Sequence, residues 1–110
     1  MNALRNKVQL IGHVGQDPEI KNIEGGKKVA NFTIATNDSY KNDKGEKVEQ
    51  TEWHKVVAWG KTAEIIEKYV TKGKEIAIEG KLTHRSYDDK NGEKRYITEV
   101  VANDLLLLGK

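Results

Sequence analysis

The amino-acid sequence predicts an all-β fold, a five-stranded Greek-key β-barrel with one short helix between its third and fourth strands. Apolar and β-branched residues gather in five short segments, and turns rich in glycine, asparagine and aspartate separate them. The one stretch with helical spacing lies between the third and fourth segments. The chain of 110 residues has no repeat or linker, so residues 1–110 are predicted to form a single domain.

The first two predicted strands are residues 7–15 and residues 29–37. The first is rich in apolar and β-branched residues, and Gly12 and Gly15 suit a bend where a barrel strand must curl. Pro18, the only proline, follows in a turn-like stretch. A Gly-Gly pair then turns the chain into the second strand, along which side chains alternate with a period of two.

The third predicted strand, residues 51–61, leads into the helix. Polar residues 38–50 precede it and contain an Asp-Lys-Gly turn signal, so we expect a hairpin with a long loop. After Gly60, apolar residues recur at helical spacing. They are Ala63, Ile66, Tyr69 and Val70. Thr62 is the predicted N-cap, and Gly73 marks the end of the helix.

Residues 75–87 and 93–108 are the last two predicted strands. An Asn91-Gly92 pair lies between them, which is the strongest short signal for a hairpin. Three strands, a helix and two strands is the order found in the oligonucleotide-binding (OB) fold.

The third strand carries a candidate platform for nucleotides. Alternation places Trp53, Lys55 and Trp59 on one face, so two indole rings flank an ammonium group. Every base has a flat π-face on which an aromatic ring can stack, and a neighbouring cation can contact phosphate. This combination predicts binding to single-stranded nucleic acid without choice of sequence.

Other aromatic and basic residues extend this platform. The fourth strand aligns Lys81, Arg85 and Tyr87 on one face, and Tyr40 stands at the entry to the polar loop beside lysines. The full candidate DNA-binding set consists of aromatic and basic side chains, namely Tyr40, Trp53, Lys55, Trp59, Lys61, Lys81, Arg85, Tyr87 and Arg95.

Structural roles compete for several of these aromatic residues. Burial in the core is the alternative for Trp59 above all, and also for Trp53, because large aromatic side chains are mostly buried in small domains. Tyr40 and Tyr87 have the alternative of exposed loop tips without a function. Three other aromatics lie among apolar neighbours and are assigned to core or subunit packing, namely Phe32, Tyr69 and Tyr96.

Composition argues against an enzyme, a metal site or a cofactor. There is no cysteine, which excludes disulfides, thiolate zinc sites and cysteine nucleophiles. The three histidines are scattered, the aspartates fall in turns, and no phosphate-binding glycine loop or nucleophile motif occurs. We therefore expect a binding protein with no cofactor.

Charge and hydropathy narrow the partners. Lysine and arginine number 19 against 17 acidic residues, so a net charge of +2 barely favours a polyanion and any nucleic-acid site must depend on local placement. No segment approaches the roughly 20 apolar residues of a membrane span, and the first ten residues lack the apolar stretch of a signal peptide. A cytoplasmic location is expected.

Long segments of the chain resemble one protein family. The segments NKVQLIGHVGQDPE, VANFTIATN, TEWHKVVAWGK, YVTKGKEIAIEGKL and RYITEVVAND are similar to those of bacterial single-stranded DNA-binding proteins, from about Asn6 to Asp104. The resemblance implies an OB-fold barrel that protects single-stranded DNA in replication, recombination and repair, close to the nucleoid. Its strand-binding aromatics match four positions here, Tyr40, Trp53, Trp59 and Tyr87.

The resemblance also implies an assembly and a departure. Members of that family usually form homotetramers, with the strand that contains His54 near subunit contacts. They typically continue into an acidic tail that recruits replication and repair proteins, whereas this sequence stops at Gly109-Lys110. Such partners are therefore expected only if a tail exists outside these residues.

Three alternative functions remain open at this level. A primosome-type accessory barrel would bind single strands while bridging replication proteins as a dimer, although the set of four aromatics argues against it. A protein-interaction module is possible because the fold hosts many unrelated functions. A metal-dependent hydrolase is remote, because no cluster of carboxylates or histidines is apparent.

Overall fold

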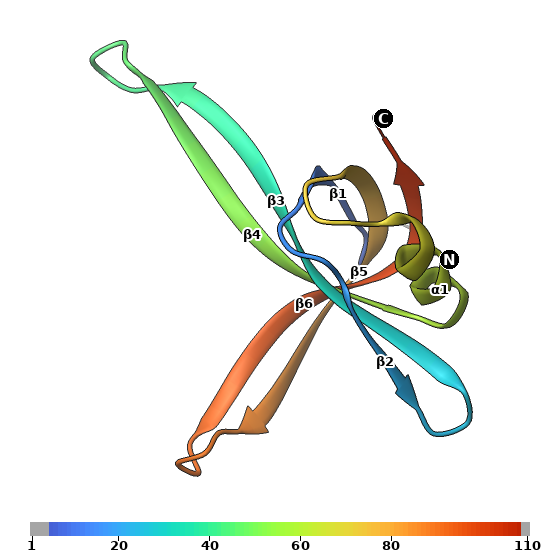
Figure 1. The fold of residues 1–110 in the computed structure, drawn as a ribbon. Helices are drawn as coiled ribbons and strands as arrows, with labels where there is room; N and C mark the ends of the chain where they lie inside the picture. Colours follow the sequence, from blue (N-terminus) through green and yellow to red (C-terminus); the bar gives the residue numbers. More distant parts are fainter. Residues whose placement is uncertain (1–4, 109–110) are drawn as a thin grey trace.

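Six strands and one helix make up residues 5–108, the part of the chain that this computed structural model describes (Figure 1). In chain order the elements are β1 (Val8–Val14), β2 (Glu19–Ile23), β3 (Lys27–Lys41), β4 (Lys47–Trp59), α1 (Gly60–Tyr69), β5 (Glu75–Asp88) and β6 (Lys94–Leu107). The predicted OB-fold barrel is confirmed, with α1 between the strands predicted as third and fourth.

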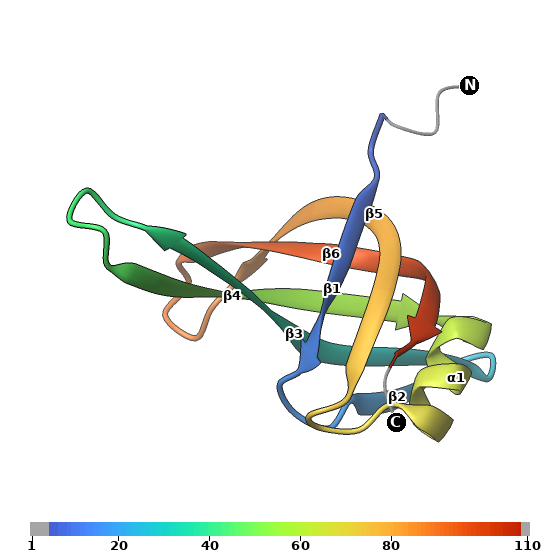
Figure 2. The same ribbon diagram turned by 90° about the horizontal axis from the view of Figure 1, so that it is seen from above.

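One sheet closes on itself to form the barrel. Its strand order is β1-β5-β6-β4-β3-β2, and β1 also pairs with β3, so β1, β3, β4, β5 and β6 enclose the core (Figure 2). All pairings are antiparallel except that of β4 with β6, which spans Val56–Ala58 and Val100–Ala102. Closure brings backbones very close, because a Cβ on Gly12 would overlap the carbonyl of Ala35.

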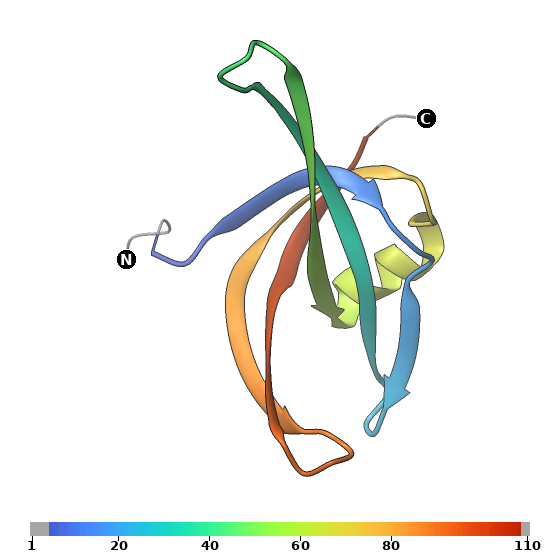
Figure 3. The same ribbon diagram turned by 90° about the vertical axis from the view of Figure 1, so that its left-hand side faces the viewer.

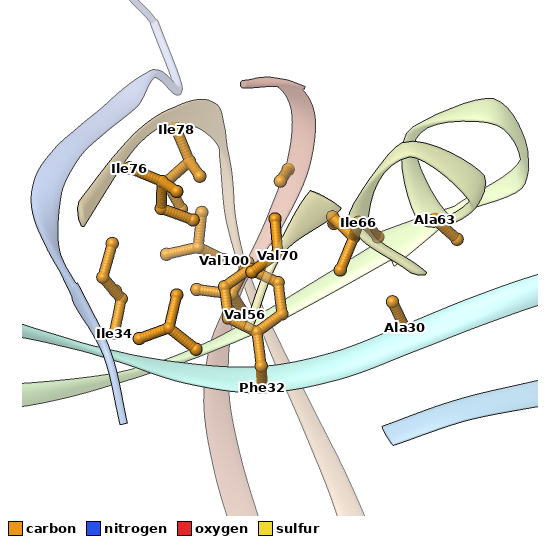
Figure 4. Close-up of a cluster of buried hydrophobic side chains, with 13 residues drawn as sticks. Ala30, Phe32, Ile34, Val56, Ala63, Ile66, Val70, Ile76, Ile78 and Val100 are labelled. Atoms are coloured by element: carbon orange, nitrogen blue, oxygen red, sulfur yellow. The ribbon is translucent and has the colours of Figure 1, made fainter. Parts of the chain in front are cut away.

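The core lies inside the barrel and under the helix. Alternate residues of the strands point inward, among them the buried Phe32, Ile34 and Val56 (Figure 4). Ala63 and Ile66 on α1 pack against the same cluster and cover the end of the barrel away from the long hairpins (Figures 2 and 4).

Two hairpins, which we call the arms, extend beyond the barrel and diverge (Figures 1 and 3). The β3–β4 arm pairs without a break as far as Lys41 and Lys47, and the β5–β6 arm as far as Asp88 and Lys94. From about residue 37 to residue 53 the β3–β4 arm is almost wholly exposed. The arms are therefore two-stranded ribbons that are anchored in the barrel.

Three predictions about the elements were wrong. Residues 19–23 form β2, an edge strand that is too polar to show alternation. Residues 38–50, predicted as a loop, are mostly paired between β3 and β4, with a turn only at residues 42–46. Main-chain hydrogen bonds between strands do not require an apolar face. Thr62 is not the N-cap. The helix begins at Gly60, where a φ of 61° turns the chain directly out of β4.

Candidate nucleic-acid interface

The outer face of β4 carries two exposed indole rings. Trp53, Lys55 and Trp59 point away from the core, because the alternate residues Val56 and Ala58 point into it. Trp53 is 62% exposed and Trp59 is 49% exposed. The structure therefore places these three candidate residues along one surface. The alternative that Trp59 is buried in the core is wrong.

The Trp53 ring lies on the end of β1. A Cβ on Gly15 would overlap Cζ3 of the Trp53 ring and would come within 2.8 Å of Oγ1 of Thr33. The sequence suggested a bend at Gly15, and the structure adds a second reason for a glycine there, because an aromatic ring occupies the space that a side chain would take. One edge of Trp53 is thus supported while most of the ring stays in solvent.

A groove runs beside this face. β4 and β6 pair over only a few residues and then separate, which leaves a concavity of about 460 Å³. Lys55 and Arg85 line it from two different strands, and Glu99 lies with them. Lys21 of the short strand β2 also lines the groove, a contribution that the sequence analysis missed together with the strand itself.

Both candidate arginines are held by carboxylates. Nε of Arg85 donates to Oε1 of Glu99 at 2.9 Å. Nε of Arg95 donates to Oδ2 of Asp89 at 2.8 Å, and its Nη2 lies 3.5 Å from Oε2 of Glu93. Three lysines belong to the candidate set, namely Lys55, Lys61 and Lys81. None of them forms an ion pair within residues 5–108.

The pairing at the tip of the β5–β6 arm shifts one titration. The hydrogen bond from Arg95 lowers the pKa of the Asp89 carboxyl, and the backbone N–H groups of Glu93 and Asn91 lower it further. Asp89 is therefore ionised at neutral pH and neutralises part of the Arg95 charge.

The remaining candidates fall on several surfaces. Lys81, Arg85 and Tyr87 lie on one face of β5, where Tyr87 is in register with Arg95 of β6. Lys61 follows Trp59 in the first turn of α1. This arrangement brings Arg85 to the groove and carries Tyr87, which is 48% exposed, towards the arm tip.

Tyr40 is the candidate that the structure does not bring to the others. The β3–β4 register pairs Ala35 with Trp53 and Tyr40 with Val48 without a bulge. Tyr40 lies five positions after Ala35, an odd number, so the two side chains point to opposite faces of the arm. Tyr40 is 49% exposed, and a strand that contacts it must reach the other side of this ribbon.

Two aromatics assigned to packing are not in the core. Phe32 is 3% exposed, as expected, but Tyr69 is 56% and Tyr96 is 78% exposed. Packing in the core is therefore wrong for Tyr69 and Tyr96, because their apolar neighbours point to the opposite face of the strand or helix. Packing of these two residues against another subunit stays a prediction. Glu99 is a further groove residue that the sequence did not single out, although a carboxylate next to a run of valines was a signal.

Within residues 5–108, no cluster of three or more potential metal-binding side chains occurs. No helix in the described part of the chain is long and apolar enough to cross a membrane.

Comparison with known proteins gives one family. The model of the single-strand binding protein family matches residues 5–108. Single-stranded DNA-binding protein 1 of Chlorobaculum tepidum is 50% identical over 105 residues, which cover 94% of this chain and 65% of that protein. Single-stranded DNA-binding protein 1 of Xylella fastidiosa is 45% identical over 109 residues, covering 98% and 80%. The chain thus spans less than two thirds of the Chlorobaculum protein.

Two solved structures have the same fold. A Plasmodium falciparum SSB in complex with ssDNA superposes with a TM-score of 0.90 at 35% identity, covering 99% of this chain and all of that one. A deletion mutant of the single-stranded DNA binding protein from Thermus aquaticus superposes with a TM-score of 0.82 at 30% identity, covering 94% of this chain and 50% of that one.

Proposed function

Because the chain belongs to the single-strand binding protein family, we propose that it binds single-stranded DNA, without sequence selectivity, on the outer face of β4 and the groove beside it. The observation that carries this proposal is the pair of exposed indoles, Trp53 and Trp59, with Lys55 between them. Two aromatic rings that flank a cation on one exposed face form the combination that binds single strands by stacking and phosphate contact.

The mechanism that we propose combines stacking with phosphate contact. Bases stack on Trp53 and Trp59, and every base offers a π-face, so affinity does not depend on base identity. Lys55, Lys61 and Lys81 contact phosphates and release counterions, which makes the affinity fall as salt rises. A duplex hides its base faces inside the helix, so stacking favours the single strand.

We propose that Tyr87 and Tyr40 continue this binding along the two arms. Tyr87 follows Arg85 on the same face of β5, which suits a strand leaving the groove towards the arm tip. Tyr40 lies on the opposite face of the β3–β4 arm, so the bound strand must pass around that ribbon to reach it. This path requires a longer strand than the contacts at the groove.

The biological role that follows is protection of exposed DNA strands during replication, recombination and repair, by binding and not by catalysis. Protection needs affinity for any sequence, and stacking with phosphate contact provides it.

We also propose that the chain self-associates as a homotetramer through the outer face of β1, β5 and β6. Ile11 and Leu106 are 61% and 63% exposed, and both lie in register with Ala77 on the strand between them. A contiguous apolar patch of this kind marks an interface. Light scattering after gel filtration should give four times the chain mass, and a monomer in solution would rule the tetramer out.

The test of DNA binding is quenching of the intrinsic fluorescence of Trp53 and Trp59 during titration with oligo-dT. Quenching by the single strand, which weakens at higher salt and is absent with duplex DNA, supports stacking with phosphate contact. An equal response to duplex DNA, or none to oligo-dT, overturns the proposal and favours a protein-interaction module.

A further inference from the structure

Glu99 is an unusual residue for a DNA-binding groove. It is 8% exposed and is the one charged side chain of residues 5–108 that is buried. It lies among the groove-lining residues with Lys55 and Arg85. A carboxylate here repels the phosphates that the groove is proposed to admit, and burying it costs folding free energy. An apolar residue would avoid both costs, so the carboxylate must provide a contact that offsets them.

The carboxylate holds Arg85 by one edge of its guanidinium. Nε of Arg85 donates to Oε1 of Glu99 at 2.9 Å, across the β5–β6 ladder. The Arg85 side chain is 56% exposed, whereas that of Glu99 is 10% exposed. The hydrogen bond uses Nε alone, so both Nη groups remain available as donors on a guanidinium that is held at one edge.

We propose that Glu99 is a positioning residue, which orients Arg85 so that its Nη groups meet a phosphate of the strand in the groove. A planar guanidinium binds phosphate best with two parallel N–H donors, and fixing the plane in advance lowers the entropy lost on binding. The negative charge of Glu99 also moderates the attraction of the groove for phosphate. This inference rests on the proposed function, because it requires a bound strand.

The charge and the hydrogen bond can be separated by two substitutions. Glu99→Gln removes the charge but keeps an acceptor for Nε of Arg85, whereas Glu99→Leu has a similar size and removes both. Positioning predicts that E99L binds oligo-dT about tenfold or more weakly than E99Q, the effect of one hydrogen bond to a charged group. E99Q itself should bind as tightly as the wild type or more tightly.

The difference between the two variants should depend on Arg85. In an Arg85→Gln background, E99L and E99Q should bind oligo-dT equally, because no guanidinium remains to be oriented. E99Q should also steepen the plot of log affinity against log salt by about 0.7, since one phosphate contact is no longer offset by the carboxylate. Glu64→Gln makes the same change of net charge on the exposed face of α1 and should leave the slope unchanged.

Each outcome decides the matter. Thermal unfolding shows which variants fold, and the comparison of E99Q with E99L in both backgrounds uses those that do. Equal affinity of E99Q and E99L with Arg85 present overturns the inference, as does a difference that persists in R85Q. Failure of the wild type to bind oligo-dT overturns the proposed function itself, and that result is distinct from the other two.

Discussion

Trp53 combines wide exposure with a fixed position, since its ring lies on Gly15 while 62% of the residue faces solvent. We expect Trp53→Ala to weaken binding to oligo-dT with little change in stability. Base–aromatic stacking in proteins of this family typically contributes about 1 to 3 kcal/mol, or roughly 5- to 150-fold in Kd. Fluorescence anisotropy of a labelled oligo-dT measures the change.

Tyr69→Ala is the matched control, because Tyr69 is similarly exposed but lies on α1 away from the groove. It should leave the affinity unchanged. If both variants bind as the wild type does, stacking at Trp53 is not part of the mechanism.

Gly15 should affect binding without touching DNA. In Gly15→Ala the added methyl overlaps the Trp53 ring, so the ring must move or the end of β1 must shift. Overpacking of this kind costs about 1 to 3 kcal/mol of stability. The midpoint urea concentration of unfolding and the affinity for oligo-dT should both decrease. In a Trp53→Ala background the loss of stability should shrink, and a loss of the same size there would contradict the contact.

At this scale the sequence predicted which side chains face outward and could not predict what supports them. Alternation along β4 was enough to place Trp53 and Lys55 on one surface. Gly15 and Glu99 act through contacts between β1 and β4 and between β5 and β6. No local pattern contains such contacts between distant segments, and therefore the sequence showed neither the ring that packs on Gly15 nor the role of Glu99.

The two arms end in the same turn. Asn42 and Asp89 each accept the backbone N–H groups two and four residues later, and Gly45 and Gly92 both have a φ of 79°. Nothing lies within 4 Å of a Cβ added at either glycine, so alanine there would meet only backbone strain.

We therefore expect Gly45→Ala and Gly92→Ala to cost the same amount, about 1 to 2 kcal/mol. Chemical denaturation of each variant measures the free energy of unfolding. A large cost at one tip and none at the other would show that the two turns are not equivalent.

The β5–β6 tip should also respond to pH. Hydrogen bonds from Arg95 and from the turn backbone lower the pKa of Asp89 in the folded chain. The ionised carboxylate stabilises the folded tip above its ordinary pKa of about 3.9. This contribution is lost as pH falls through the lowered folded value.

Arg95→Gln should raise the pKa of Asp89 towards its ordinary value. Carbon-13 NMR titration of the carboxyl group measures it. The carboxyl of Glu79, whose pKa is lowered by hydrogen bonds from Lys7 and Gln9, provides the internal reference. An Asp89 titration that does not change would assign the shift to the turn backbone alone.

Elements with an apolar face could be predicted, and those without one could not. The strands of the barrel and α1 bury one side, and this burial fixes the spacing of their apolar residues. β2 packs only Ile20 against the core, and the outer half of the β3–β4 arm buries neither side. Their residues are chosen for other contacts, and for that reason residues 38–50 read as a loop although most of them are paired.

For the molecule as a whole, salt should report how many phosphates it contacts. If Lys55, Lys61 and Lys81 each meet one phosphate, log affinity should fall against log salt with a slope of about −2 per chain. Replacing Lys55 with glutamine should make the slope shallower by about 0.7. A slope near zero would mean that stacking alone provides the affinity.

The order of the strands predicted the barrel, but nothing local predicted how it closes. Closure depends on β1 crossing β3 at His13 and Val14, next to a glycine that lets two backbones approach. Gly80 does the same on β5, where a Cβ would overlap the carbonyl of Val101. Glycine in a strand has several causes, so the sequence marked Gly12 as a bend without showing its partner and did not single out Gly80.

The arms have a consequence for motion. Beyond the barrel each is a ribbon without a core, and an isolated two-stranded hairpin is only marginally stable in water. Their amide protons should therefore exchange with deuterium through local fraying, while those of the core strands exchange only when the barrel opens. The molecule thus consists of a rigid barrel with two flexible arms. A ligand that contacts both arms must order them, and its binding free energy is reduced by the conformational entropy that they lose.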